Sequence, residues 1–164
     1  MTQQSVFHLE PFARFLRRVV ELNRLHSPDD PLHDALELDH DAWHAFVESA
    51  GPDVDAAVAA RKELATIHEH FPSGSPAHRQ AAYLVRAFSV ARPFAEANHR
   101  TGWDYVSELL EHNGFELMAG VEEGRGLGNE VWERIDPAAA DVGDDDEVLE
   151  YLSEWFRPRI AKTG

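Results

Sequence analysis

The chain has 164 residues, enough for one domain with a substantial core and too few for two independent ones. Its 30 acidic residues against 15 Lys and Arg give a formal net charge of -15, a field that opposes binding to a nucleic-acid backbone, so we expect no direct nucleic-acid partner. Because 43% of the residues are hydrophobic, the composition also excludes a disordered acidic segment.

The absence of cysteine excludes disulfides, thiol nucleophiles and cysteine-ligated zinc. No apolar stretch approaches the roughly eighteen residues of a membrane span, and residues 1–10 lack the basic and apolar segments of a secretion signal. We therefore expect a cytoplasmic protein with no membrane partner. Only Lys62 and Lys162 are lysines, and such an acid-rich, arginine-for-lysine composition favours a halophilic protein, with an ordinary acidic cytosolic protein as the alternative.

Apolar residues recur at the three- and four-residue spacing of helices almost throughout the chain. In the first half, a helix is expected after Pro11, and residues 27–31 have the composition of a loop. A second helix should end before Gly51, and a third should begin with Asp53 as its cap.

The second half begins with a helix predicted at residues 77–90, whose nearly all-apolar composition indicates a central position. A polar turn, a helix, a short extended piece, a glycine-interrupted helix, an acidic loop and a last helix should follow at residues 91–97, 98–112, 115–117, 123–134, 136–146 and 146–156. No β period is long enough to require a sheet. We therefore predict an all-α fold, a single helical bundle of six to seven helices over residues 1–164.

Residues 92–101 read RPFAEANHRT and form a polar turn between the two most apolar helices. The turn carries Glu96, an acid able to hold magnesium, and leads into a helix start whose free amides face outward near residues 98–101. Such a helix N-terminus binds phosphate oxygens through unpaired N–H groups and a partial positive charge. Arg100 adds a forked donor for a second phosphate, and magnesium needs only one or two carboxylates when a nucleotide supplies further oxygens.

This segment resembles the Fic/Doc motif, His-x-Phe-x-(Asp/Glu)-(Gly/Ala)-Asn-(Gly/Lys)-Arg, and is most similar to its death-on-curing (Doc) branch, where Ala-Asn-x-Arg-Thr is typical. The positions that match are Phe94, Glu96, Ala97, Asn98, Arg100 and Thr101. The resemblance extends over the preceding helix, with AYLV at residues 82–85, and over LLEHNGF at residues 109–115. It thus covers residues 77–117, about a quarter of the chain.

The resemblance implies an enzyme that uses ATP and Mg²⁺ to transfer a phosphoryl or adenylyl group to a Ser, Thr or Tyr hydroxyl of a target protein. Glu96 would hold the metal. The phosphate site would comprise Ala97, Asn98, His99, Arg100 and Thr101. Such catalysis is positioning and charge stabilisation around a phosphoryl group. The Doc branch also implies the toxin half of a toxin-antitoxin pair, so an antitoxin-like protein is an expected partner.

One departure from the motif concerns the catalytic base. Arg92 stands where the family has its histidine, and a guanidinium with a pKa above about 12 does not accept a proton near neutral pH. General-base help is worth about a hundredfold to ten-thousandfold, so any activity should be weakened. Two catalytic-site roles stay open: His99 as a surrogate base, and Arg92 as an added phosphate clamp in a tighter but slower nucleotide binder.

The alternative to an enzyme is a catalytically inactive nucleotide- or partner-binding module that keeps the fold and the anion hole. Simpler roles also stay open for single residues. Glu96 would then be a first-turn acid that complements the helix dipole, and Arg100 would form a surface ion pair. Thr101 would be structural and Phe94 a core anchor.

Three further features could have a function of their own. His40 and His44, four residues apart on one helix face, could bind zinc beside Asp41, or could be solvated surface histidines. The acidic run at residues 144–147 is more typical of a solvated helix cap than of a calcium loop. One of the tryptophans could line a groove for a partner peptide, although all four are expected to be core or partly buried. These are Trp43, Trp103, Trp132 and Trp155.

Overall fold

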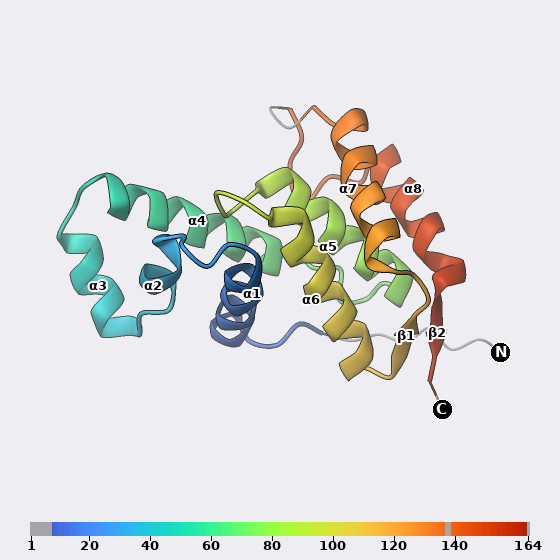
Figure 1. The fold of residues 1–164 in the computed structure, drawn as a ribbon, viewed down its shortest axis with the longest axis horizontal. Helices are drawn as coiled ribbons and strands as arrows, with labels where there is room; N and C mark the ends of the chain where they lie inside the picture. The colour runs from blue at the N-terminus through green and yellow to red at the C-terminus, as the bar shows by residue number, and fades with distance from the viewer. Residues whose placement is uncertain (1–7, 137–138, 164) are drawn as a thin grey trace.

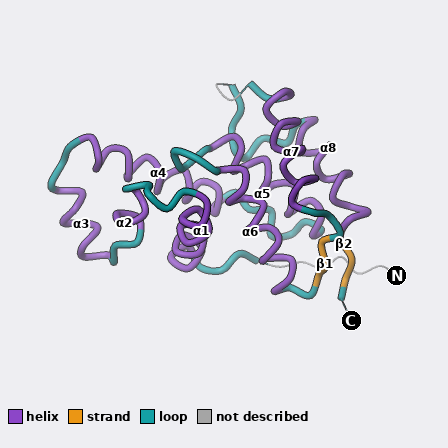
Figure 2. Tube along the Cα trace, in the orientation of Figure 1, coloured by secondary structure: helices purple, strands orange, loops and turns teal. Residues whose placement is uncertain are grey.

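The computed structural model of the chain describes residues 8–136 and 139–163, and its architecture is almost entirely helical (Figures 1 and 2). The all-α prediction is confirmed, since helices make up 68% of the structure. Within the described residues the elements, in chain order, are α1 (Phe12–His26), α2 (Leu32–Leu36), α3 (His40–Glu48), α4 (Pro52–Glu69), α5 (Ala77–Ala91), α6 (Asn98–His112), β1 (Phe115–Leu117), α7 (Val121–Arg134), α8 (Glu147–Phe156), a 3-10 turn (Arg157–Arg159) and β2 (Ile160–Lys162).

Helix α5 is the central helix of the bundle, as its apolar sequence predicts. It packs against α4, α6, α7 and α8, and most of its residues are buried. Figure 1 shows α2 and α3 at one end of the molecule and α7, α8 and the two strands at the other. Among the described helices, none combines the length and the apolar character needed to cross a membrane.

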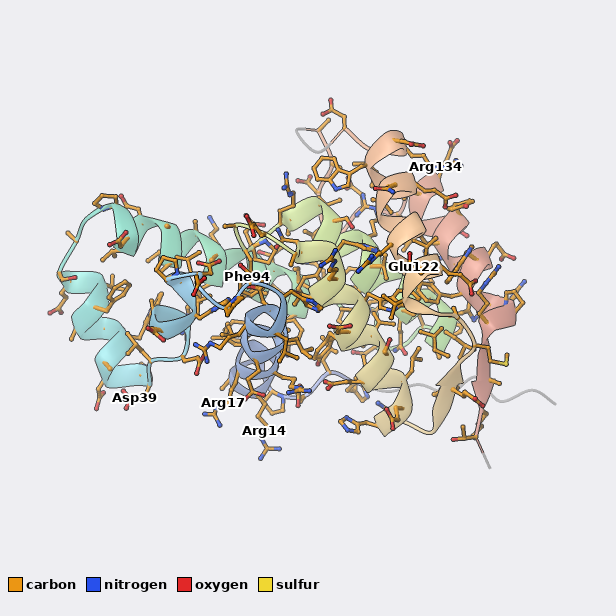
Figure 3. All side chains as sticks on the ribbon, viewed as in Figure 1. Arg14, Arg17, Asp39, Phe94, Glu122 and Arg134 are labelled. Atoms are coloured by element: carbon orange, nitrogen blue, oxygen red, sulfur yellow. The ribbon has the colours of Figure 1, made fainter. Side chains whose placement is uncertain are left out.

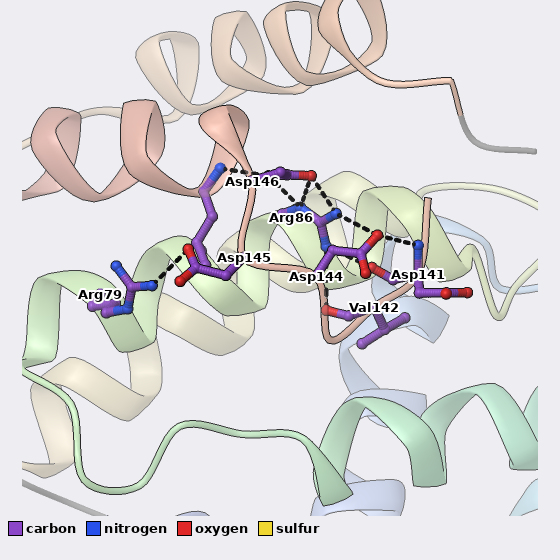
Figure 4. A network of polar contacts seen from close by, with 8 residues as sticks. Arg79, Arg86, Asp141, Val142, Asp144, Asp145 and Asp146 are labelled. Atoms are coloured by element: carbon purple, nitrogen blue, oxygen red, sulfur yellow. Dashed lines mark hydrogen bonds and ion pairs between the residues drawn. The ribbon is translucent and has the colours of Figure 1, made fainter. Parts of the chain in front are cut away.

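Arg86 of α5 has no exposed surface and is neutralised by the acidic loop before α8 (Figure 4). Its Nε and Nη2 atoms donate to the Asp146 carboxylate at 3.1 and 2.6 Å, and its Nη1 atom donates to the carbonyl oxygens of Asp141 and Val142. Asp146 also caps α8 by accepting a hydrogen bond from the Leu149 N–H. Because a buried charge without a partner is strongly destabilising, the acidic run both caps a helix and fixes its loop to the core.

Several features differ from the sequence-based expectation. Helix α2 is an additional element of five residues, too short to show a helical period. Strand β2 pairs antiparallel with β1, with Phe115 opposite Lys162, so the predicted extended piece belongs to a small sheet. The prediction of Asp53 as a helix cap is wrong: Gly51 takes that position with φ of 129°, a conformation suited to glycine, and Pro52 begins α4 with a φ already fixed for the helix.

Candidate functional site

The loop between α5 and α6 is bounded at both ends by residues in the left-handed conformation. Arg92 ends α5 with φ 48° and ψ 60°, and Ala97 precedes α6 with φ 60° and ψ 28°. A side chain with a Cβ atom is disfavoured in this region by about 1 kcal/mol or more. Strained positions of this kind persist where the surrounding contacts enforce them, and they cluster at binding loops.

Asn98 supplies the contact that closes the loop. Its side-chain Oδ1 accepts from the Phe94 N–H at 2.8 Å, and its Nδ2 donates to the Phe94 carbonyl oxygen at 2.8 Å. Both residues are buried. Both polar atoms of the Asn98 side chain are therefore bonded within the loop. Figure 3 labels Phe94 on this loop.

Two buried polar residues from α1 and α2 hold the loop from behind. Asn23 donates to the Glu96 carbonyl oxygen at 3.0 Å and to the Thr101 hydroxyl at 3.1 Å. His33 Nε2 lies 2.6 Å from Asn23 Oδ1, and burial lowers the pKa of His33, so the neutral ring donates through Nε2. Neither residue is predicted from the sequence. Their only signal was a polar side chain within an apolar helical stripe, as for Asn23 beside Leu22.

A cleft of about 390 Å³ opens beside the start of α6. Residues of α5, the loop, α6 and α7 line it: Ser89, Arg92, Ala97, Asn98, His99, Arg100, Arg125, Gly128, Asn129 and Trp132. Among the described residues, the lining thus holds three arginines and no carboxylate, although the chain has 30 acidic residues and 15 Lys and Arg. The local charge of the cleft is opposite in sign to the charge of the molecule.

The first turn of α6 adds backbone donors to this cleft. The Thr101 N–H is bonded to the Ala97 carbonyl oxygen at 3.0 Å, which is the first turn-closing bond of the helix. The N–H groups of Asn98, His99 and Arg100 precede it and have no acceptor within the helix. Together with the positive end of the helix dipole, they favour an anion at this point. The sequence-predicted residues Ala97, Asn98, His99 and Arg100 therefore line one cleft, while the Thr101 hydroxyl donates to Ala97 O at 2.8 Å.

Helix α7 contributes one face to the cleft, which no motif in the sequence predicted. Arg125, Asn129 and Trp132 stand at positions i, i+4 and i+7, a spacing that places them on the same side of a helix. Figure 3 labels Glu122 and Arg134 toward the two ends of this helix. The Arg92 guanidinium lies 4.8 Å from the centroid of the Trp132 ring, so the two walls of the cleft are in contact.

Two of the three glycines of α7 that the sequence suggested as interruptions, Gly124 and Gly128, allow the helix to approach α6 closely. A Cβ on Gly124 would lie 2.6 Å from the Trp103 ring, and one on Gly128 would lie 2.7 Å from the His99 ring. Contacts this short do not accommodate a methyl group. Helix α7 is continuous from Val121 to Arg134. At Gly124 and Gly128 the packing lost with the missing side chain is offset by the close approach of α6.

His99 is packed between α6 and α7. Its Nε2 lies 2.5 Å from the Gly124 carbonyl oxygen. Because a carbonyl oxygen only accepts hydrogen bonds, Nε2 carries the proton and donates it to this bond. Burial lowers the pKa of His99 and keeps it neutral, against the opposing effect of the bond to Gly124. The remaining Nδ1 is buried with no hydrogen-bond partner among the described residues. This geometry favours a structural role for His99 over that of a surrogate base.

Glu96, the sequence-predicted metal ligand, is exposed and lies outside the cleft lining. Its backbone carbonyl is the group tied to Asn23. Magnesium takes oxygen ligands and usually at least one protein carboxylate, and the cleft lining offers guanidinium groups in that place. The donor set of the cleft lining therefore does not fit Mg²⁺.

The competing sequence features do not form a comparable site. His40 and His44 lie with ring centroids 4.4 Å apart, but no group of three or more His, Asp or Glu side chains suited to a metal occurs in the described part of the chain. Trp103 is buried, and Trp43 and Trp155 are partly buried. Trp132 is 40% exposed and is the tryptophan that lines the cleft.

Comparison of the chain with known protein families, with curated proteins and with solved structures finds no match.

Proposed function

We propose that the chain is a nucleotide-binding module of the Fic/Doc type that holds the phosphate chain of ATP in the cleft at the start of α6. One observation carries the proposal: Arg92, Arg100 and Arg125 gather in a cleft without a carboxylate, in a chain with twice as many acidic residues as Lys and Arg. Guanidinium groups recognise phosphate through paired donors, and the first-turn amides of α6 supply further donors.

The same residues favour binding over group transfer. Transfer to a hydroxyl needs a group that accepts its proton, and Arg92 has no such capacity at neutral pH. His99 is the only residue of the described lining whose ordinary pKa suits a base. Its Nε2 is bonded to Gly124 and its Nδ1 is buried, so neither nitrogen is placed to reach a protein substrate.

Transfer of a phosphoryl or adenylyl group to a protein hydroxyl, with an antitoxin-like partner, is the second candidate. It is supported by the loop itself, because the bonds between Asn98 and Phe94 and the strained ends at Arg92 and Ala97 keep the anion hole preformed. Preorganised donors of this kind are what phosphoryl transfer requires apart from the base. The two candidates therefore differ in whether the site has a base for the hydroxyl proton, which the motif places at the position of Arg92.

Isothermal titration of the full chain with ATP tests the binding proposal. The titration should be done at a potassium chloride concentration at which circular dichroism shows that the chain has its helical fold. We expect saturable binding at one site, and Arg100→Gln should weaken it roughly tenfold or more, because a hydrogen bond to a charged group is worth about 1.5 to 3 kcal/mol. Absence of saturable binding by the folded wild-type chain rejects the proposal.

Incubation of the chain with α- and γ-labelled ATP and a protein extract distinguishes the two candidates. If the chain is a binding module, the wild-type chain should label no protein. The matched variant is Arg92→His, which restores the histidine that the motif has as its base. Label on a protein with the wild-type chain establishes the enzyme instead. The choice of label then separates phosphoryl transfer from adenylyl transfer.

A further inference from the structure

We propose that the cleft binds the phosphate chain of its nucleotide without a divalent cation, with Arg92, Arg100 and Arg125 in the place that Mg²⁺ takes in metal-dependent sites. The inference rests on the proposed function and specifies how that cleft neutralises its ligand. It departs from the metal dependence that the sequence resemblance implies.

The first support is the charge of the lining. Three guanidinium groups that stay protonated at all physiological pH values face a ligand whose phosphates are anionic. The helix start adds roughly half a positive charge. This total is comparable with the negative charge of a di- or triphosphate chain, so a divalent cation added to the complex would bring positive charge into a cleft that is already neutralised.

The second support is the availability of the three side chains. Arg92 and Arg100 are exposed and form no ion pair within the described residues. Arg92 is instead held over Trp132. Arg125 pairs with Glu122 at 3.4 Å, but the Glu122 side chain is 86% exposed, and such a surface pair is worth at most about 1 kcal/mol. All three are therefore free to turn to a phosphate at little cost.

The third support is the position of the carboxylates. Glu96 is separated from the first turn of α6 by Ala97 in its left-handed turn, is exposed, and does not line the cleft. Glu122, the α7 carboxylate that pairs with Arg125, also lies outside the lining. A magnesium ion on the phosphates would thus have arginines as neighbours rather than the one or two protein carboxylates that usually bind it beside phosphate oxygens and waters.

Two titrations of the same folded chain test this inference, one with ATP in EDTA and one with ATP in saturating Mg²⁺. We expect binding in EDTA to be at least as tight as in Mg²⁺. We also expect Mg²⁺ to weaken it by about threefold to tenfold, because the cation screens the phosphate charge that the arginines recognise. Inorganic triphosphate, titrated in EDTA, should compete with ATP, which shows that the phosphate chain is the recognised part.

The outcomes separate the inference from the proposed function. Binding that needs Mg²⁺, or any gain in affinity from Mg²⁺, overturns the inference and leaves nucleotide binding in place. Loss of that gain in Glu96→Gln would then assign the metal to Glu96. Binding of ATP in EDTA that inorganic triphosphate does not compete also overturns it. Absence of binding in both solutions overturns the proposed function and the inference together.

Discussion

The guanidinium of Arg92 lies over the ring of Trp132, 4.8 Å from its centroid. This contact joins the end of α5 to α7 across the cleft and places a cation on an indole that is 40% exposed. A cation–π contact at such an exposed site is worth about 0.5 to 1 kcal/mol, less than a charge-assisted hydrogen bond to phosphate. A phosphate ligand should therefore draw Arg92 away from the indole.

Tryptophan fluorescence should report this movement. We expect the emission of the wild-type chain to change as ATP is added, because Trp132 loses its cation. The three other tryptophans lie outside the cleft lining, so Trp132→Phe should remove most of the change while Arg92 keeps an aromatic ring to rest on. A full fluorescence change in the Trp132→Phe variant contradicts the predicted exchange of partners.

The close packing of α7 predicts opposite effects for two neighbouring glycines. Gly128→Ala places a methyl group 2.7 Å from the His99 ring and should lower the free energy of unfolding by about 1 to 3 kcal/mol through overpacking. Gly126 has open space at the same atom, so Gly126→Ala should raise stability by up to about 1 kcal/mol through helix propensity. Urea denaturation of both variants measures the difference. Equal effects of the two substitutions are incompatible with the packing described.

The closure of the loop by Asn98 predicts a large loss of stability in Asn98→Ala. The substitution leaves the buried N–H and carbonyl of Phe94 without their partner, at a cost of about 2 to 4 kcal/mol for the two groups. Asn113 provides the control, because its side chain donates to the Leu109 carbonyl at an exposed site where water can replace it. Asn113→Ala should cost less than about 1 kcal/mol. Thermal unfolding of the two variants checks the prediction, and a comparable loss in both would count against a structural role for Asn98.

The pairing of Arg86 with Asp146 predicts an acid-sensitive fold. Burial by itself raises the pKa of Asp146, but hydrogen bonds from Arg86 and from the Leu149 N–H, with the charge of Arg86, outweigh burial and hold the pKa below its usual value. A carboxylate with a lowered folded-state pKa contributes stability above its unfolded pKa of about 3.9, and this stability is lost as the pH falls through the folded pKa. The free energy of unfolding should therefore fall below about pH 4.

Asp146→Asn isolates that contribution at neutral pH. We expect a loss of about 2 to 4 kcal/mol, about 1 kcal/mol less than the roughly 3 to 5 kcal/mol for a fully buried pair, because the Asp146 side chain is 35% exposed. Asp145→Asn removes a carboxylate that pairs with Arg79 and is 70% exposed, so it should cost less than about 1 kcal/mol. Denaturation at pH 7 and pH 3.5 checks both points. A pH dependence that Asp146→Asn leaves unchanged would show that other groups cause it.

The features that the sequence predicted well depend on local signals. The bounds of α6, from Asn98 to His112, follow from the polar turn before it and from the Asn-Gly pair after it, and the central position of α5 follows from its own apolar residues. The candidate site was located through a motif of ten consecutive residues. Four of its predicted phosphate-binding residues line one cleft.

The features that the sequence did not predict depend on contacts between distant segments. Asn23 bonds to the Glu96 carbonyl across 73 positions, and no local pattern indicates such a partner. Arg125 and Trp132 reach the cleft only because Gly124 and Gly128 let α7 approach α6. The sequence shows the low helix propensity of these glycines, so they resemble helix breakers. It does not show that the rings of Trp103 and His99 pack against them.

We propose that the arginines of this cleft bind phosphate, and a matched pair of variants tests this most directly. Arg125 and Arg157 each pair at 3.4 Å with a glutamate three residues earlier, but only Arg125 lines the cleft. Titration of ATP into the two variants should show Arg125→Gln weakening the affinity roughly tenfold and Arg157→Gln changing it by less than about twofold. Equal affinities in the two variants would contradict the account.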